Sequence, residues 1–215
     1  MRGPTTRRRA RTHHLTVLPT WARIGALLVP LIVALAYAQA APADDASKPG
    51  NPILHAAIVG VLLHDEGPFA DRLEAGSLDI NVEAQFHRPQ ANWWRWIGSP
   101  YPHVGANVNI GGETSMLYAG LTWEYYALKR LAGTFSAGMA AHNGQLNQPE
   151  KVLCDRDGDC GFGSRLIFRF SAGIRYDVTD HVGVEAFYDH ISHNKILDAE
   201  NEGIDSVGLR MRYRF

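Results

Sequence analysis

Apolar and polar residues alternate along most of the chain from residue 78 onward. In the segment 78–86, for example, Leu78, Ile80 and Val82 are apolar, whereas Asp79 and Asn81 between them are polar. A period of two is typical of β-strands whose two faces meet different surroundings. The alternation recurs in the segments 104–110, 117–125, 131–139, 166–176, 182–188 and 207–215. Together with a less regular apolar segment at 53–63, it predicts an all-β chain of about eight antiparallel strands.

The length of the predicted strands suits a membrane barrel. Most of the segments have about 9–12 residues, which is what a tilted strand needs to cross a bilayer. Turn-forming pairs such as Gly111-Gly112 and Asn143-Gly144 separate the segments. Beyond residue 40, no apolar run approaches the roughly 18 residues of a helical span, so a membrane location would require strands.

The direction in which the apolar faces point distinguishes a membrane barrel from a soluble one. In a membrane barrel they face lipid and polar side chains fill the lumen, whereas a soluble barrel reverses the two. The apolar positions here are bulky, and many positions between them are glycine, as a narrow lumen requires. Aromatic residues gather near strand ends, and Trp93, Trp94 and Trp96 among them predict anchoring at the membrane interface. The sequence ends on Phe215, in an alternating strand. These features favour an eight-stranded antiparallel transmembrane β-barrel, and a soluble periplasmic lipid-binding barrel is the alternative.

The N-terminal region predicts export. An arginine-rich stretch precedes an apolar run at 24–36, and Ala36, Ala38 and Ala40 give the small-residue spacing that signal peptidase requires. We therefore expect a cleaved signal peptide at 1–40, a flexible lead-in at 41–52 and the barrel at 53–215. A single membrane anchor is the alternative, but the apolar run is short for a span of about 20 residues.

Charge and cysteine content narrow the function further. The formal net charge of −1 argues against a nucleic-acid partner, because neutralising phosphates takes a basic surplus. Cys154 and Cys160 lie in a polar segment, and since an exported protein meets an oxidising compartment, we expect them to form a disulfide. Seven charged residues at inward-facing positions should pair within the lumen and fill it. They are Glu83, Glu124, Arg169, Arg175, Glu185, Arg210 and Arg212.

Histidines are scattered near the predicted strand ends, and solvent exposure is the default expectation for them. The five in question are His64, His87, His103, His142 and His181. Their spacing does not suggest a metal site.

The last two predicted strands carry the residues best suited to chemistry. His190 and Ser192 are two apart, so on a strand their side chains share a face and lie within reach of a hydrogen bond. Both have the parity of the lipid-facing residues of their strand, and so does Asp205 in the next strand. A nucleophile, an imidazole base and a carboxylate that orients the base can make up a serine hydrolase site. Because polar side chains against lipid are costly and usually functional, the predicted substrate is part of the membrane itself. The alternative is that these residues lie beyond the apolar band in a solvated loop.

This region resembles the active-site stretch of the lipid A 3-O-deacylase family of outer-membrane enzymes. The segment 190–192, His-Ile-Ser, matches the family's base and nucleophile, and Asp205 stands where the family has its acidic residue, a glutamate. His193 stands where the family has asparagine, which comes one position later as Asn194. The resemblance implies an eight-stranded barrel with its site on the outer surface.

The resemblance also implies a reaction. It indicates an outer-membrane serine esterase that removes the ester-linked 3-hydroxyacyl chain at position 3 of lipid A, without metal or organic cofactor. Ser192 would attack, His190 would move the proton and Asp205 would orient His190. Asn194 and Asn201 are candidate oxyanion donors, and Glu202 is the alternative acid.

The predicted partners are therefore lipid A, as part of lipopolysaccharide, and the outer membrane. The oligomeric state stays open between a monomer and a homodimer. The alternative function is a non-catalytic small barrel with a structural or adhesive role, in which the segment around Cys154 and Cys160 meets a partner.

Overall fold

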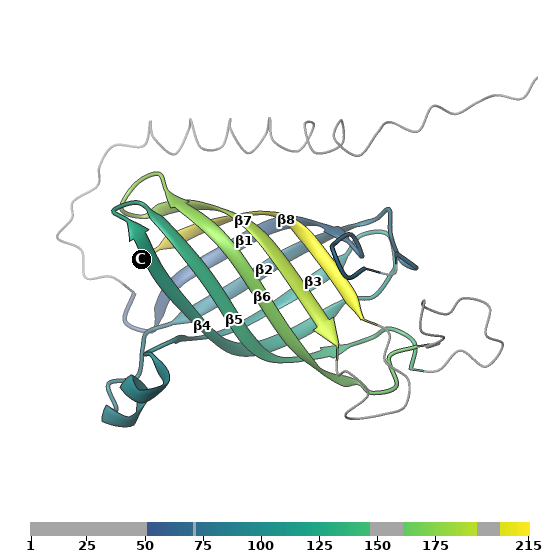
Figure 1. Cartoon of the computed structure of the whole chain (residues 1–215), viewed down its shortest axis with the longest axis horizontal. Coiled ribbons are helices and arrows are strands. Elements are labelled where there is room, and N and C mark those ends of the chain that lie inside the picture. Colours follow the sequence, from purple (N-terminus) through teal and green to yellow (C-terminus); the bar gives the residue numbers. More distant parts are fainter. Residues whose placement is uncertain (1–50, 71, 147–160, 193–202) are drawn as a thin grey trace, which may run out of the picture. The chain divides into compact units, whose positions relative to one another are not determined.

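The protein is a closed antiparallel β-barrel, described by a computed structural model for residues 51–70, 72–146, 161–192 and 203–215. Each strand pairs with its neighbours in sequence, and the first pairs with the last to close the barrel (Figure 1). The strands are β1 (Leu54–His64), β2 (Leu78–Phe86), β3 (Tyr101–Asn109), β4 (Met116–Leu128), β5 (Leu131–His142), β6 (Leu166–Asp177), β7 (Val182–Ser192) and β8 (Ile204–Arg214). The predicted fold class and number of strands are confirmed.

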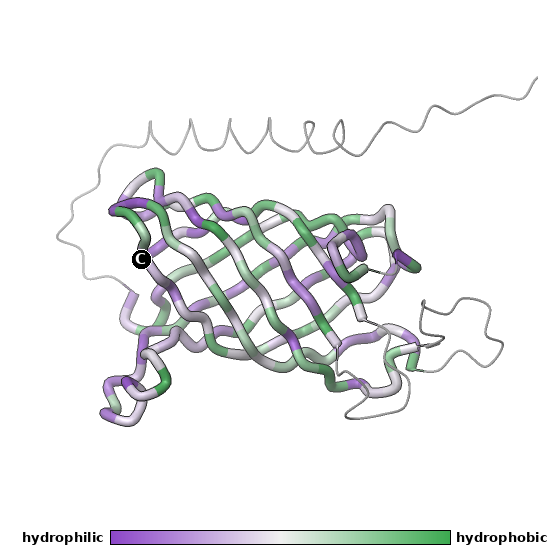
Figure 2. The backbone as a smooth tube through the Cα atoms, viewed as in Figure 1, coloured by the Kyte–Doolittle hydropathy of each residue, from purple (hydrophilic) through white to green (hydrophobic). Residues whose placement is uncertain are grey.

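Apolar side chains form the outer wall and polar side chains fill the interior. In β2, Asp79 and Asn81 are fully buried, whereas Val82 exposes 44% of its surface. The same alternation of hydropathy follows the strands around the barrel (Figure 2). Burial of the polar set and exposure of the apolar set is the arrangement of a membrane barrel, so the soluble alternative is excluded.

A short 3-10 helix, η1 (Asn92–Ile97), lies between β2 and β3 and was not predicted. Trp93 and Trp96 are exposed on it, Trp96 to 90%. Trp94 is instead buried, and its indole N–H donates a hydrogen bond to the carbonyl oxygen of Pro100 at 2.8 Å. Membrane anchoring was therefore the wrong interpretation for Trp94, which fixes the loop. In the part of the chain described here, no helix has the length and apolar character of a membrane span.

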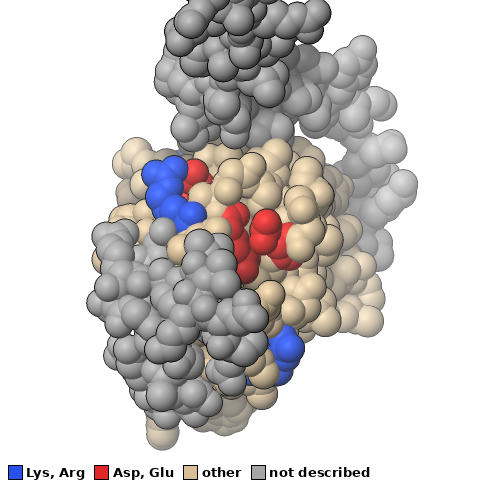
Figure 3. All heavy atoms as spheres, turned by 90° about the vertical axis from the view of Figure 1, so that its right-hand side faces the viewer, with Lys and Arg blue, Asp and Glu red and all other residues tan. Residues whose placement is uncertain are grey.

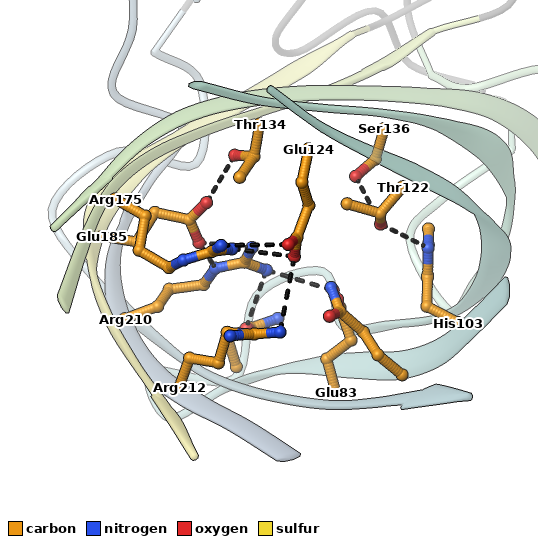
Figure 4. A network of polar contacts seen from close by, with 12 residues as sticks. Glu83, His103, Thr122, Glu124, Thr134, Ser136, Arg175, Glu185, Arg210 and Arg212 are labelled. Atoms are coloured by element: carbon orange, nitrogen blue, oxygen red, sulfur yellow. Dashed lines mark hydrogen bonds and ion pairs between the residues drawn. The ribbon is translucent and has the colours of Figure 1, made fainter. Parts of the chain in front are cut away.

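Paired charges fill the lumen, as predicted (Figure 4). Arg210 lies 2.6 Å from Glu185 and 3.1 Å from Glu83, and its guanidinium carbon stands 3.4 Å from the centroid of the Phe187 ring. Arg175 pairs with Glu124 at 2.8 Å. Buried charges are tolerated only when they are paired and hydrogen-bonded, so these contacts are a condition of the narrow, filled barrel.

Three of the five histidines are buried, contrary to the prediction of solvated side chains. His64, His103 and His142 point inward and are almost inaccessible, whereas His87 and His181 are exposed. Proximity to a strand end does not by itself expose a side chain, because the inward face of a small barrel is covered along its whole length.

The lumen closes with an apolar cluster at the end of the barrel where β7 ends and β8 begins. The buried members of this cluster are Met116, Tyr118, Ala140, Phe162, Ile167, Ile191 and Ile204. Ile191 lies between His190 and Ser192 in sequence, and Ile204 precedes Asp205. Inward packing of these two isoleucines therefore holds both strands in place behind the outward-facing polar residues.

The predicted signal peptide at 1–40, nearly all of the lead-in and the predicted disulfide between Cys154 and Cys160 fall outside the described residues.

Replacing Arg210 with alanine should destabilise the barrel strongly. The change leaves Glu83 and Glu185 buried without their main cation, which costs about 3–5 kcal/mol for a buried pair. Urea unfolding in detergent micelles measures the effect. Arg95→Ala, on the exposed surface of η1, is the matched control and should stay within about 0.5 kcal/mol of the parent protein. Equal unfolding midpoints for the two variants would contradict this role of the lumen charges.

Candidate active site

The pairing of β7 with β8 brings the three predicted site residues together. His190 is the direct cross-strand partner of Asp205, and Ser192 lies two residues further along the same face of β7. The Nδ1 atom of His190 is 2.7 Å from Oδ1 of Asp205, and its Nε2 atom is 2.9 Å from Oγ of Ser192. Directly opposed side chains in an antiparallel pair are close enough to touch, so register alone accounts for the first contact.

The donors and acceptors of this chain follow from the chemistry of the groups. An ionised carboxylate only accepts hydrogen bonds, so Nδ1–H of His190 donates to Asp205. In the neutral imidazole, Nε2 is then an acceptor, and the hydroxyl of Ser192 donates to it. Such an arrangement can take a proton from the serine hydroxyl as the serine attacks.

Asp205 faces outward, yet only 1% of its surface is exposed, because the loop between β1 and β2 lies over it. The backbone N–H of Phe69 donates to Oδ2 of Asp205 at 2.7 Å, and that of Glu66 donates to the Asp205 carbonyl oxygen at 3.0 Å. Gly67 packs so tightly that a Cβ atom there would stand 2.4 Å from Oδ2. Asp205 is therefore held in place by the β1–β2 loop, which is not part of the β7–β8 hairpin.

Tyr188 is a further neighbour of the acid. It lies two residues before His190 on the outward face of β7, and its hydroxyl donates to Oδ1 of Asp205 at 2.9 Å. Oδ1 thus accepts hydrogen bonds from both Tyr188 and His190.

The loop over Asp205 is itself anchored by a half-buried carboxylate, that of Glu74. It accepts hydrogen bonds from Nε2 of His64 and from the backbone N–H and hydroxyl of Thr114, each at 2.9 Å. Burial tends to raise the pKa of Glu74, but the hydrogen bonds from His64 and Thr114 together outweigh it and hold this pKa below the ordinary value. The neighbouring Asp65 differs, since burial raises its pKa.

The surroundings of the three residues change from polar to apolar over a short distance. Phe168 and Phe170 of β6 are the cross-strand partners of Ser192 and His190. The Phe69 ring is 71% exposed and stands edge-on to His190, with the ring centroids 6.2 Å apart. The end of the barrel beyond them carries acidic side chains near its middle and basic side chains toward its edges (Figure 3). The candidate site therefore lies where the apolar wall meets a charged end.

Of the site residues predicted from the sequence, the structure brings together His190, Ser192 and Asp205. The other candidates, Asn194, Asn201 and Glu202, lie outside the described residues, as does His193. Among the described residues, no group of three or more histidine, cysteine or acidic side chains could hold a metal ion.

Sequence reasoning missed Tyr188, Gly67 and Phe69. A signal existed for Tyr188, because it has the parity of His190 and lies two positions away. No local signal existed for the loop residues, since they reach Asp205 through the pairing of β1 with β8.

The closed wall, its apolar exterior and its paired lumen charges define the class of this protein as an eight-stranded transmembrane β-barrel. Within that class, the sequence profile described as Lipid A 3-O-deacylase (PagL) matches residues 78–214, which is more than half of the chain. The chain belongs to this lipid A 3-O-deacylase family.

Solved structures with a similar fold include three small barrels. The outer membrane enzyme PagL is 18% identical, with a TM-score of 0.49 over 74% of this chain and 98% of that one. A designed transmembrane β-barrel is 16% identical, with a TM-score of 0.45 over 79% and 98% of the two chains. Neisserial surface protein A is 10% identical, with a TM-score of 0.44 over 78% and 100%. No curated protein matches the chain by sequence.

Replacing Gly67 with alanine should disturb the loop over Asp205. The added Cβ would overlap the Asp205 carboxylate, and overpacking of this kind costs about 1–3 kcal/mol. Gly133→Ala in β5 is the matched control, because a Cβ there meets no atom within 4 Å. Thermal unfolding in detergent micelles should show a lower midpoint for Gly67→Ala alone. A midpoint for Gly67→Ala as high as that of Gly133→Ala would show that the loop does not press on Asp205 as described.

Proposed function

We propose that this protein is an outer-membrane serine esterase that removes the ester-linked 3-hydroxyacyl chain at position 3 of lipid A. The observation that carries the proposal is the hydrogen-bond chain from Asp205 through His190 to Ser192 on the outward face of the barrel. Membership of the lipid A 3-O-deacylase family supports the choice of substrate.

In the proposed reaction, Oγ of Ser192 attacks the carbonyl carbon of the ester while Nε2 of His190 takes the hydroxyl proton. The tetrahedral intermediate then expels the sugar 3-oxygen, which receives that proton from His190. Water, activated by the same imidazole, hydrolyses the acyl-serine and releases the 3-hydroxy fatty acid. Asp205 keeps Nδ1 protonated and stabilises the imidazolium in both steps. Asn194 and Asn201 are the proposed oxyanion donors.

The position of the site suits a lipid ester. Such an ester lies between a polar headgroup and apolar chains, and Ser192 is the last residue of β7, at the end of the apolar wall. Phe168, Phe170 and Phe69 offer apolar surface beside the reacting atoms on which an acyl chain could rest. A membrane substrate would thus reach the serine by lateral movement within the bilayer.

The connections between strands support placing this end of the barrel on the outside of the cell. Bacterial outer-membrane barrels have short periplasmic turns and longer extracellular loops. The site end carries the long connections 65–77, 143–165 and 193–203, whereas the opposite end carries the tight turns 129–130 and 178–181 together with the longer connection 87–100. On this orientation the site lies at the outer leaflet, where lipopolysaccharide resides.

Loss of the nucleophile or of the base should abolish lipid A deacylation. Purified protein in detergent, incubated with lipid A, should release a 3-hydroxy fatty acid detectable by mass spectrometry. Ser192→Ala and His190→Ala should each slow this release by roughly 10³-fold or more, since the members of such a unit act together. Asp205→Ala should lower the rate in the same direction, because it removes the group that orients His190.

The matched control is His181→Ala, which removes an exposed histidine at the opposite end of the barrel and should keep full activity. Heat-modifiable migration on gels checks that each variant is folded. Undiminished deacylation by folded Ser192→Ala would exclude this mechanism. An unchanged acylation pattern with the parent protein would favour the non-catalytic barrel instead.

A further inference from the structure

We propose that Tyr188 and the loop segment 66–69 form a clamp on Asp205, and that Tyr188 is a positioning residue for the reaction. The inference rests on the proposed function, because it concerns how the acid of that site is held. It adds to the site a residue and a loop that do not belong to the Ser-His-acid set.

The clamp acts on both oxygens of one carboxylate. Oδ1 of Asp205 accepts from the Tyr188 hydroxyl at 2.9 Å and from Nδ1 of His190 at 2.7 Å. Oδ2 accepts from the backbone N–H of Phe69 at 2.7 Å. With a donor fixed on each oxygen, the carboxylate cannot rotate without breaking a charge-assisted hydrogen bond. The orientation that suits His190 is therefore set before substrate arrives.

The space around the acid explains why a short side chain is held this way. A Cβ atom on Gly67 would stand 2.4 Å from Oδ2 and 2.5 Å from Cβ of Asp205, so the loop backbone lies directly against the acid. A longer carboxylate side chain would collide with this backbone. Asp205, which has one methylene fewer than glutamate, fits beneath this backbone. Its hydrogen bonds to the clamp then set the orientation of its carboxylate.

The loop reaches Asp205 because the barrel is closed. His64, the last residue of β1, pairs with Ser206 of β8, so the chain leaving β1 passes directly over the start of β8. The backbone N–H of Glu66 then donates a hydrogen bond to the Asp205 carbonyl oxygen at 3.0 Å. Glu74 anchors the far side of the loop through His64 and Thr114. Hydrogen bonds therefore hold the loop on both sides of the segment that contacts Asp205.

The test measures the reactivity of Ser192 directly, in the full-length protein in detergent micelles. An alkyl fluorophosphonate reports it without lipid A, because Oγ of an activated serine displaces fluoride from phosphorus. Tyr188→Phe removes only the hydroxyl, and Tyr176→Phe, exposed on the outer face of β6, is the matched control. Tyr188→Phe should lower the labelling rate and kcat for lipid A roughly tenfold with KM unchanged, as expected for a hydrogen bond to a charged group. Tyr176→Phe should lower neither.

A double-mutant cycle separates positioning from other roles. In an Asp205→Ala background, Tyr188→Phe should have no further effect, because the group on which it acts is gone. Gly67→Ala tests the loop side of the clamp and should slow labelling, whereas Gly133→Ala should not. An unchanged rate in folded Tyr188→Phe overturns the proposal, and so does an equal loss with and without Asp205. A rise in KM alone would make Tyr188 a substrate contact and also overturn it.

Failure of the clamp and failure of the proposed function give different results. If Ser192 is labelled but lipid A is unchanged, the substrate is wrong, and the labelling rates still decide the clamp. If the parent protein is active and Tyr188→Phe matches it, only the clamp fails. A folded parent protein that neither reacts with the probe nor deacylates lipid A overturns both.

Discussion

Closure of the sheet by the pairing of β1 with β8 is the constraint on which the rest of the structure depends. In lipid, every backbone N–H and C=O group needs a partner within the protein, and an open sheet edge would leave a row of them unpaired. Pairing β1 with both β2 and β8 removes that edge. The same pairing sets His64 opposite Ser206 and so carries the β1–β2 loop over Asp205. The wall and the candidate site therefore share one geometric cause.

Polar groups find their partners in different ways on the two faces of the barrel wall. Inside, charged side chains such as Arg210 are held by ion pairs in a filled lumen. Outside, His190, Ser192 and Asp205 face the lipid side, where an unpaired polar group is costly. They satisfy one another in a chain of hydrogen bonds, and the loop shields Asp205. Such a hydrogen-bonded cluster can therefore lie at the edge of the apolar wall without leaving a polar group unpaired.

Much of this arrangement could be predicted from residue pattern, and each failure has its own physical cause. Alternation in β2 and its counterparts predicted which side chains face lipid, and the parity of His190, Ser192 and Asp205 placed them on one face. The burial of His64 was missed because the segment before it, 53–63, is apolar at both odd and even positions and so gives no sign of which way His64 points. The role of Trp94 in fixing the loop was missed because its partner, the Pro100 carbonyl, depends on how the loop around η1 folds back.

The sequence by itself determined the strands and the face on which each side chain lies, because a period of two is a local property of an extended backbone. Only the tertiary structure decided which residues on that face meet. The register of β7 against β8 sets His190 opposite Asp205, and barrel closure brings Phe69 and Gly67 to the same carboxylate from far away in the chain. Those contacts depend on pairings between distant segments, and no local pattern of residues specifies how distant segments align.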